Sequence, residues 1–321
     1  AAVCATGRVR TENQDRIYLN GTICGGGQEL ARKIIEDERA RIKSFLDDNR
    51  ELVESCENSD TIPGRVRPRL INLSNCENVW ISGITLKNGP SWNVHMIYCD
   101  DIQTDHCTFV SEGVWNGDGW DPDSSTNCTL FASEFSTGDD AVAIKSGKNP
   151  EGNEINRPCA HIRVFDCRSD CGHGICIGSE MSGGVEDVQI WDCDLANSLS
   201  GIEIKATPKR GGYVRGVTVR DCITPRVMLH SVPYNDDGVP AGAPPKLEHC
   251  FFERLTLTAE VLDHDRSRHG AAPIEIAGFD KPGYEVEDIV FKDITITKPS
   301  VALPLGLCKG VTLSNLACVK E

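Results

Sequence analysis

Aromatic side chains, basic charge and long hydrophobic runs are all scarce in this chain of 321 residues. Phe, Trp and Tyr make up 6% of it, and 33 Lys and Arg stand against 48 Asp and Glu, which gives a net charge of −15. This balance argues against nucleic acid or an anionic membrane surface as the main partner, because no global excess of cations neutralises phosphates. The longest apolar stretches, such as residues 301–307, contain proline and are far shorter than the roughly 20 residues that span a bilayer. We therefore expect neither a nucleic-acid-binding nor a membrane protein.

A short phrase recurs along the chain, in which a polar residue precedes an alternation of β-branched and polar residues. Its first apolar positions include Val79, Ile102, Cys128, Ile162 and Val188, which are 23, 26, 34 and 26 residues apart. Alternation with period two indicates a strand, and repetition at this spacing indicates equivalent strands stacked in parallel. The pattern predicts an all-β protein, a parallel β-helix solenoid, with residues 1–321 as a single domain.

Cysteine occupies one position of this repeat. Cys107, Cys167, Cys193 and Cys222 each follow the first apolar position by five residues, and Ile84 does so in an earlier repeat. Free cysteine packs as a small buried hydrophobe, so we predict a core column of mostly reduced thiols among the sixteen cysteines. Reduced thiols favour a reducing compartment, and we expect a bacterial cytoplasm in preference to a secreted or periplasmic location.

A zinc site is the alternative explanation for the cysteines near His173. Cys167, Cys171, His173 and Cys176 lie close together in the sequence, but they contain no CxxC pair. Because Cys167 already belongs to the core column, we expect no metal and no cofactor.

Two segments depart from the strand pattern. Residues 28–56 are rich in helix formers and place Leu30, Ile34, Ile42 and Leu46 at helical spacing, which predicts a short helical insertion that supports the solenoid. Residues 233–245, rich in proline and glycine, predict a long loop of the kind that often borders a binding face.

Four polar clusters interrupt the apolar repeat, at residues 116–123, 138–140, 172–174 and 201–205. Asp118 and Asp139 are 21 residues apart, Asp140 and His173 are 33 apart, and His173 and Lys205 are 32 apart. These intervals match single coils, and successive coils lie about 4.8 Å apart. The spacing therefore predicts three carboxylates, an imidazole and an ammonium group in one small patch.

Such a patch is suited to proton transfer. Clustered carboxylates raise one another's proton affinity, so that one can stay protonated as an acid while another is ionised as a base. Glycoside hydrolysis needs this pairing. The residues alone also allow a calcium site, because grouped aspartates ligate hard cations. Any single Asp-Gly pair can also be a simple turn.

At these positions the sequence resembles glycoside hydrolase family 28, the polygalacturonase family of right-handed β-helices. The resemblance covers roughly residues 20–320, and its motifs follow one another at coil spacing. In chain order they are Asn116-Gly117-Asp118-Gly119, Gly138-Asp139-Asp140, Gly172-His173-Gly174, the partial match Glu203-Ile204-Lys205, and Arg210-Gly211-Gly212.

The resemblance implies an inverting glycoside hydrolase and a role for each residue of the patch. Asp139 would protonate the glycosidic oxygen, and Asp118 and Asp140 would activate the attacking water. His173 would orient or tune the acid, and Lys205 would bind a uronate carboxylate. The expected partner is a pectic oligosaccharide or polysaccharide, and the further substrate-binding residues would be Glu203, Asn116, Arg210, Tyr234 and His95.

The sequence departs from the family pattern at several positions. Gly117 replaces a threonine, which we expect to loosen the turn, and Cys24 stands where the family has an aspartate. We expect the N-terminal cap region of the family to be missing. Glu203 replaces an arginine, which predicts a neutral or decorated sugar on one side of the scissile bond, as in rhamnogalacturonan, unless Glu203 simply pairs with Lys205 or Arg210.

Two other functions fit the same fold. A calcium-dependent pectate lyase would need metal ligands and an arginine base, and the replacement by Glu203 removes the obvious arginine. A β-helix that binds carbohydrate without catalysis, such as an adhesin, gives no reason for paired acids beside His173. Endo or exo action and the oligomeric state stay open.

Overall fold

The structure is a computed structural model of the chain. It describes residues 3–4, 9–12, 18–19, 21–27, 69–236, 238–298 and 302–319. The helical insertion predicted at residues 28–56 lies outside the described residues.

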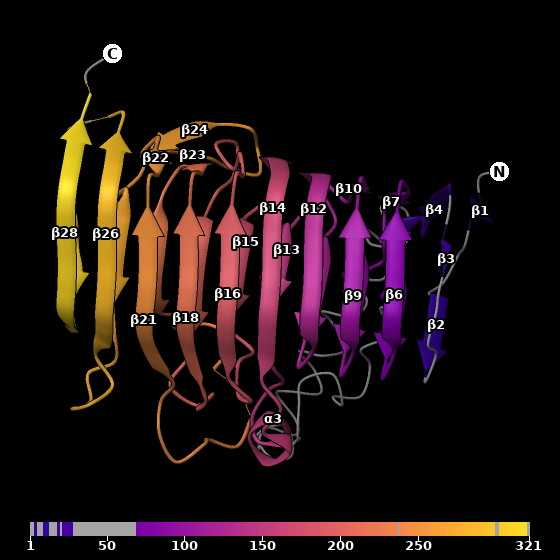
Figure 1. Ribbon diagram of the computed structural model, residues 1–321, viewed down its shortest axis with the longest axis horizontal. Helices are drawn as coiled ribbons and strands as arrows, with labels where there is room; N and C mark the ends of the chain where they lie inside the picture. Colours follow the sequence, from indigo (N-terminus) through magenta and orange to yellow (C-terminus); the bar gives the residue numbers. More distant parts are fainter. Residues whose placement is uncertain are drawn as a thin grey trace, which may run out of the picture.

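Two long parallel sheets run along the molecule and are connected coil by coil (Figure 1). The first sheet has 16 strands. They are β1 (Val3–Cys4), β3 (Tyr18–Leu19), β4 (Thr22–Cys24), β6 (Glu77–Ser82), β7 (Thr85–Lys87), β9 (Asp100–Asp105), β10 (Thr108–Val110), β12 (Thr126–Ser136), β14 (Cys159–Cys171), β16 (Val185–Trp191), β18 (Tyr213–Arg220), β19 (Ile223–Thr224), β21 (Lys246–Glu253), β22 (Thr256–Leu257), β26 (Val286–Ile296) and β28 (Cys308–Cys318).

The second sheet has 10 strands and carries the polar clusters. They are β2 (Val9–Glu12), β5 (Ile71–Ser74), β8 (Val94–Ile97), β11 (Trp120–Asp123), β13 (Val142–Ile144), β15 (Gly174–Gly178), β17 (Gly201–Ala206), β20 (Val227–Ser231), β25 (Ile274–Ala277) and β27 (Leu305–Gly306). An antiparallel hairpin, β23 (Glu260–Leu262) and β24 (Arg268–Gly270), and the short helix α3 (Glu151–Ile155) lie outside these sheets. No helix among the described residues is both long and apolar enough to cross a bilayer.

The strand register confirms the repeat that predicted the parallel β-helix. Val79 pairs with Ile102, and Ile102 pairs with Cys128 on the next coil. Further along the chain Ile162 pairs with Val188. The first apolar positions of the phrase therefore form one continuous inward-facing row, and all of these side chains are buried.

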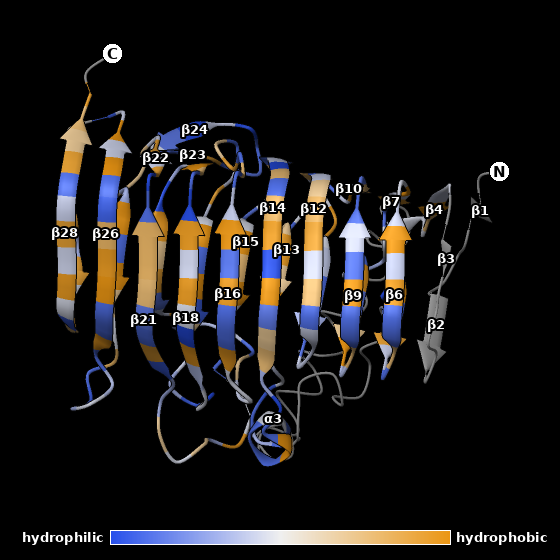
Figure 2. Cartoon of the chain, in the orientation of Figure 1, coloured by the Kyte–Doolittle hydropathy of each residue, from blue (hydrophilic) through white to orange (hydrophobic). Residues whose placement is uncertain are grey.

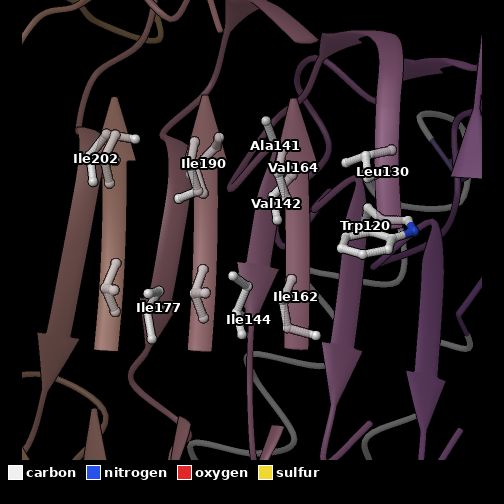
Figure 3. Packing of buried hydrophobic residues seen from close by; sticks show 14 of the residues in the cluster. Trp120, Leu130, Ala141, Val142, Ile144, Ile162, Val164, Ile177, Ile190 and Ile202 are labelled. Atoms are coloured by element: carbon white, nitrogen blue, oxygen red, sulfur yellow. The ribbon is translucent and has the colours of Figure 1, made fainter. Parts of the chain in front are cut away.

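The core lies between the two sheets. Figure 3 shows Ile144 and Ile177 of the second sheet and Ile162 and Ile190 of the first among the packed side chains of this interior. Each of the four is at most 2% exposed. Figure 2 shows the corresponding alternation of hydrophobic and hydrophilic residues along β14, β16 and β18. Because burial of one such side chain stabilises a fold by about 1.5–3 kcal/mol, repetition over many coils makes the solenoid a rigid support for the second sheet.

Cysteines lie in the predicted column, with one interruption. Ser133 interrupts the column between Cys107 and Cys167. The backbone N–H of Cys107 donates to the Ser133 hydroxyl, and Ser133 pairs with Cys167 in strand register. Cys193 and Cys222 continue the column on the next two coils, and all four cysteines are buried. Fourteen of the cysteines among the described residues carry free thiols.

Candidate active site

The polar clusters meet where the chain turns from the first sheet into the second. The Gly119 N–H donates to the Asp140 carbonyl at 3.0 Å, and the His173 N–H donates to the Asp139 carbonyl at 3.0 Å. Trp120 pairs with Val142, which in turn pairs with Ile175. The continuous register of β11, β13 and β15 thus places Asp118, Asp140 and His173 on three successive coils.

His173 connects the two carboxylates of the Gly-Asp-Asp motif. Its Nδ1 lies 3.0 Å from Oδ1 of Asp139 and 3.0 Å from Oδ1 of Asp140. Burial would lower the pKa of His173, but the hydrogen bonds and charges of Asp139 and Asp140 outweigh it and raise the pKa to about 10. The imidazole is therefore a cation at neutral pH.

Lys205 neutralises Asp140 from the other side. Its Nζ lies 3.0 Å from Oδ2 and 3.2 Å from Oδ1 of Asp140. Burial alone would raise the pKa of Asp140, yet the charge of Lys205 and the hydrogen bond from His173 hold it well below its usual range. Asp140 stays ionised across the ordinary pH range.

Asp118 is held in a different state. Burial, followed by the charges of Asp139 and Asp121, raises its pKa well above the usual range. Its Oδ1 is buried without a hydrogen-bond partner, and Oδ2 lies 4.0 Å from Nζ of Lys145. Asp118 and Asp140 are thus a pair of buried carboxyls whose environments push their proton affinities apart.

Two glycines allow the backbone to approach closely here. Gly174 has a φ of +96°, and a Cβ at this position would lie 2.3 Å from the Gly201 carbonyl oxygen. A Cβ at Gly117 would lie 2.7 Å from the Val114 carbonyl oxygen. The expectation that Gly117 loosens its turn is wrong, because the Gly117 N–H donates to Val114 at 3.0 Å in a turn too tight for a side chain.

Glu203 has a partner that the sequence did not suggest. Its Oε1 lies 2.8 Å from Nε2 of His230 on the next coil, and the residue is only 4% exposed. Burial would raise the pKa of Glu203, but the His230 hydrogen bond and the charge of Lys205 lower it to about 2. Glu203 is therefore an ionised carboxylate bound to His230 rather than to Arg210.

Three of the remaining residues predicted from the sequence lie at or beside this cluster. Nδ2 of Asn116 lies 3.5 Å from Oδ2 of Asp139. The ring of Tyr234 is half exposed, and partial burial followed by the charge of Glu203 raises its pKa to about 12. His95 pairs in strand register with Asp121 and is buried against Trp92.

Arg210 does not face the cluster. Its guanidinium is fully buried and donates to the Ser179 carbonyl at 3.1 Å, to Oδ1 of Asn149 at 2.5 Å and to the Asn235 carbonyl. These bonds tie the loop after β20 to the body of the solenoid. The predicted contact of Arg210 with substrate therefore disagrees with the structure, which gives this side chain a supporting position.

Sequence reasoning missed three side chains at the site. Lys145 is a buried cation 3.4 Å from Glu180 and 4.0 Å from Asp118. Asp121 is fully buried, with neither carboxyl oxygen hydrogen-bonded, and burial raises its pKa well above the usual range. Asp121 lies within the polar cluster 116–123, and Lys145 directly follows the apolar residues 141–144. His264 lies 3.3 Å from His173, a contact that no spacing indicated because 91 residues separate the two.

Asp139, Asp140 and His173 are the residues most able to hold a cation among the parts of the chain that the structure describes. Lys205 already neutralises Asp140, and His173 carries a proton on the nitrogen that faces the carboxylates. The arrangement therefore favours proton chemistry over metal binding.

The fold defines the chain as a parallel β-helix protein that carries a buried cluster of acids and bases on one face. Over 99% of its length it superimposes, with a TM-score of 0.76 and 21% identity, on 73% of a hyperthermoactive exopolygalacturonase from Thermotoga maritima. The model of the glycosyl hydrolases family 28 matches residues 51–232. The chain belongs to this family, as its motifs indicated.

Two curated relatives are similar over about half of the chain. A probable polygalacturonase of Vitis vinifera is 42% identical over 157 residues, which is 48% of this chain and 32% of the relative. An endo-polygalacturonase of Pectobacterium carotovorum subsp. carotovorum is 34% identical over 163 residues, which is 50% of this chain and 38% of the relative. The chain thus spans about a third of the length of the curated relatives it matches.

Proposed function

We propose that this protein is an inverting glycoside hydrolase that cleaves galacturonate-containing pectic polysaccharides or oligosaccharides. The observation that carries the proposal is the difference in access among three adjacent carboxyls. The side chain of Asp139 is 18% exposed, whereas those of Asp118 and Asp140 are 4% and 3% exposed. A substrate oxygen can reach Asp139, while the other two are held inside the cluster.

Asp139 is the proton donor in this proposal. Its Oδ1 accepts hydrogen bonds from Nδ1 of His173 and from the Asp140 N–H at 3.0 Å each. These two bonds fix the carboxyl, and Oδ2, which lies 3.5 Å from Nδ2 of Asn116, carries the proton toward the glycosidic oxygen. Protonation of that oxygen lets the bond to the anomeric carbon break as the leaving sugar takes the proton.

Asp118 and Asp140 have different roles in the attack of water on the anomeric carbon. Asp118, with its high proton affinity, accepts the proton of the attacking water once it is ionised, because a carboxylate of raised pKa is the stronger base. The fixed charge of Asp140 stabilises the oxocarbenium-like transition state. Attack opposite to the leaving group inverts the anomeric configuration.

Lys205 supports a uronate substrate. Its ammonium is buried beside Asp140, and although burial would lower its pKa, the charge of Asp140 raises the pKa well above the usual range. A permanent cation beside the reacting carboxyls attracts a carboxylate of the sugar chain. The polygalacturonase names of the relatives favour the same substrate class.

One assay separates this function from the two alternatives. The protein is incubated with oligogalacturonides and rhamnogalacturonan fragments, and reducing ends are followed together with the absorbance of a conjugated double bond. A hydrolase produces reducing ends alone, a lyase produces both signals, and a binding protein produces neither. Formation of the double bond, or no product from any pectic fragment, would overturn the proposal.

The sugar beside Glu203 is a finer part of the proposal. We infer that this carboxylate favours a neutral or decorated sugar over a second galacturonate, because like charges repel. The His230 contact reduces that repulsion without removing it. The native protein and Glu203→Arg are compared on polygalacturonate and on rhamnogalacturonan oligomers, with Glu248→Arg on the first sheet as the matched control. Activity of the native protein that is highest on polygalacturonate and falls in Glu203→Arg would refute this specificity and leave the hydrolase proposal intact.

A further inference from the structure

The hairpin β23–β24 leaves the regular solenoid and lies beyond the ends of the first-sheet strands β18 and β21 (Figure 1). Several contacts tie it to coils that precede it by up to 154 residues. Nη2 of Arg266 lies 2.6 Å from Oε1 of Glu112, and Nη1 donates to the Asp170 carbonyl at 3.0 Å. Arg268 donates to Oδ1 of Asn197 at 2.6 Å. The hairpin tip is thereby held over the coils that carry the catalytic turns.

His264 in this tip contacts the nitrogen of His173 that the carboxylates leave open. The two Nε2 atoms are 3.3 Å apart, and the rings meet edge to face with centroids 5.3 Å apart and an interplanar angle of 61°. The His173 cation has an N–H on each ring nitrogen. Nδ1–H donates to Asp139 and Asp140, so the cation can donate its Nε2–H to Nε2 of His264 in the tautomer that carries its proton on Nδ1.

We infer that His264 is a positioning residue for the catalytic carboxyls and acts through His173. An imidazole held at both nitrogens cannot rotate away from Asp139 and Asp140, and the proton donor keeps its orientation. This inference rests on the proposed function. The inference also gives the hairpin a function. The ion pair between Arg266 and Glu112 holds the hairpin so that Nε2 of His264 lies 3.3 Å from Nε2 of His173 on a distant coil.

The test compares two substitutions that separate hydrogen bonding from packing. His264→Gln keeps an acceptor, and His264→Phe keeps an aromatic ring without one. We expect His264→Phe to lower kcat about 10-fold to 100-fold with little change in KM, because small misplacement of a catalytic group costs rates of this size. His264→Gln should retain most of the activity. His269→Phe, on the same hairpin and bonded to Ser267, is the matched control and should behave as the native protein.

The pH profile provides a second readout that packing alone would not move. The groups facing His173 are Asp139, Asp140 and His264, with Lys205 on the far side of Asp140. We expect kcat to fall at alkaline pH as His173 loses its proton. Loss of the acceptor destabilises the His173 cation, so this fall should move to lower pH in His264→Phe and not in His264→Gln. Thermal unfolding checks that each variant is folded.

The outcomes distinguish this inference from the proposed function. If the native protein hydrolyses no pectic substrate, the proposed function fails. If the native protein is active and His264→Phe keeps its kcat and its alkaline limb, or if His264→Gln loses as much as His264→Phe, the positioning role of His264 is overturned. Arg266→Gln, which removes the tether to Glu112, should reproduce part of the loss.

Discussion

Asp139 differs from the two neighbouring carboxyls in its access to solvent, and this difference makes its substitution the most direct test at the scale of a single residue. Asp139→Asn keeps the shape of the side chain and an oxygen that accepts from His173, but its amide is not an acid that can protonate the glycosidic oxygen. We expect turnover to fall about 10²-fold to 10⁴-fold, with thermal stability nearly unchanged or higher because carboxylate repulsion is relieved.

Initial rates on oligogalacturonides and a thermal unfolding curve measure both effects. Asp288→Asn, an exposed carboxylate beside His249 on the first sheet, serves as the control. If Asp139→Asn retained more than about a tenth of the native rate, Asp139 would not be the general acid.

His173 gives a pH dependence whose sign follows from its raised pKa. The pKa rises from 6.5 to about 10 in the folded protein, so the folded state binds the proton more tightly than the unfolded chain. The stabilisation from the cation is fully present below pH 6.5 and is lost as the pH rises through about 10. We therefore expect the stability difference between the native protein and His173→Gln to be constant below pH 6.5 and to shrink toward pH 10. Urea unfolding at several pH values measures it, and a difference independent of pH would contradict the assignment of a His173 cation.

At the scale of one structural element, the Gly-His-Gly turn depends on the absence of a side chain. Gly174 combines a positive φ with a Cβ position 2.3 Å from the Gly201 carbonyl oxygen, so an added methyl group must displace backbone. We expect Gly174→Ala to destabilise the protein by about 1–3 kcal/mol and to lower activity by moving His173.

The matched control for this turn is Gly242→Ala, where an added Cβ would meet nothing within 4 Å. Denaturant unfolding and initial rates are measured for both variants. Equal stability of Gly174→Ala and Gly242→Ala would show that the turn can open without cost.

At the scale of the whole molecule, the thiols report on how the solenoid is held together. We expect thiol titration of the denatured protein without reductant to find most of the sixteen cysteines free, because the core column packs without covalent bonds. In the native protein most should react slowly, since burial raises the pKa of thiols such as Cys99, to about 12, and Cys250, to about 12. A count near zero in denaturant would contradict this view.

The sequence by itself determined the coils and most of the chemistry. Val79, Ile102 and Cys128 share one register on successive coils, and the local alternation of apolar and polar residues already indicates it. One face of each strand must be buried, so a shift by one residue would expose all the apolar side chains of that strand. The motifs around Asp118, Asp140 and His173 keep that register because they directly precede the paired strands β11, β13 and β15.

Only the tertiary structure decided which side chains meet, because the coils differ in length. The spacing of 32 residues predicted that Lys205 and His173 share one patch, but not which atoms meet. In strand register the Ser200 N–H donates to the His173 carbonyl, and Lys205 reaches Asp140 from further along its strand. The pairing of Glu203 with His230 depends on strand partners, and the contact between His173 and His264 depends on the path of a hairpin. The path of a hairpin is set by contacts between residues far apart in the sequence, and no local pattern of residues encodes it.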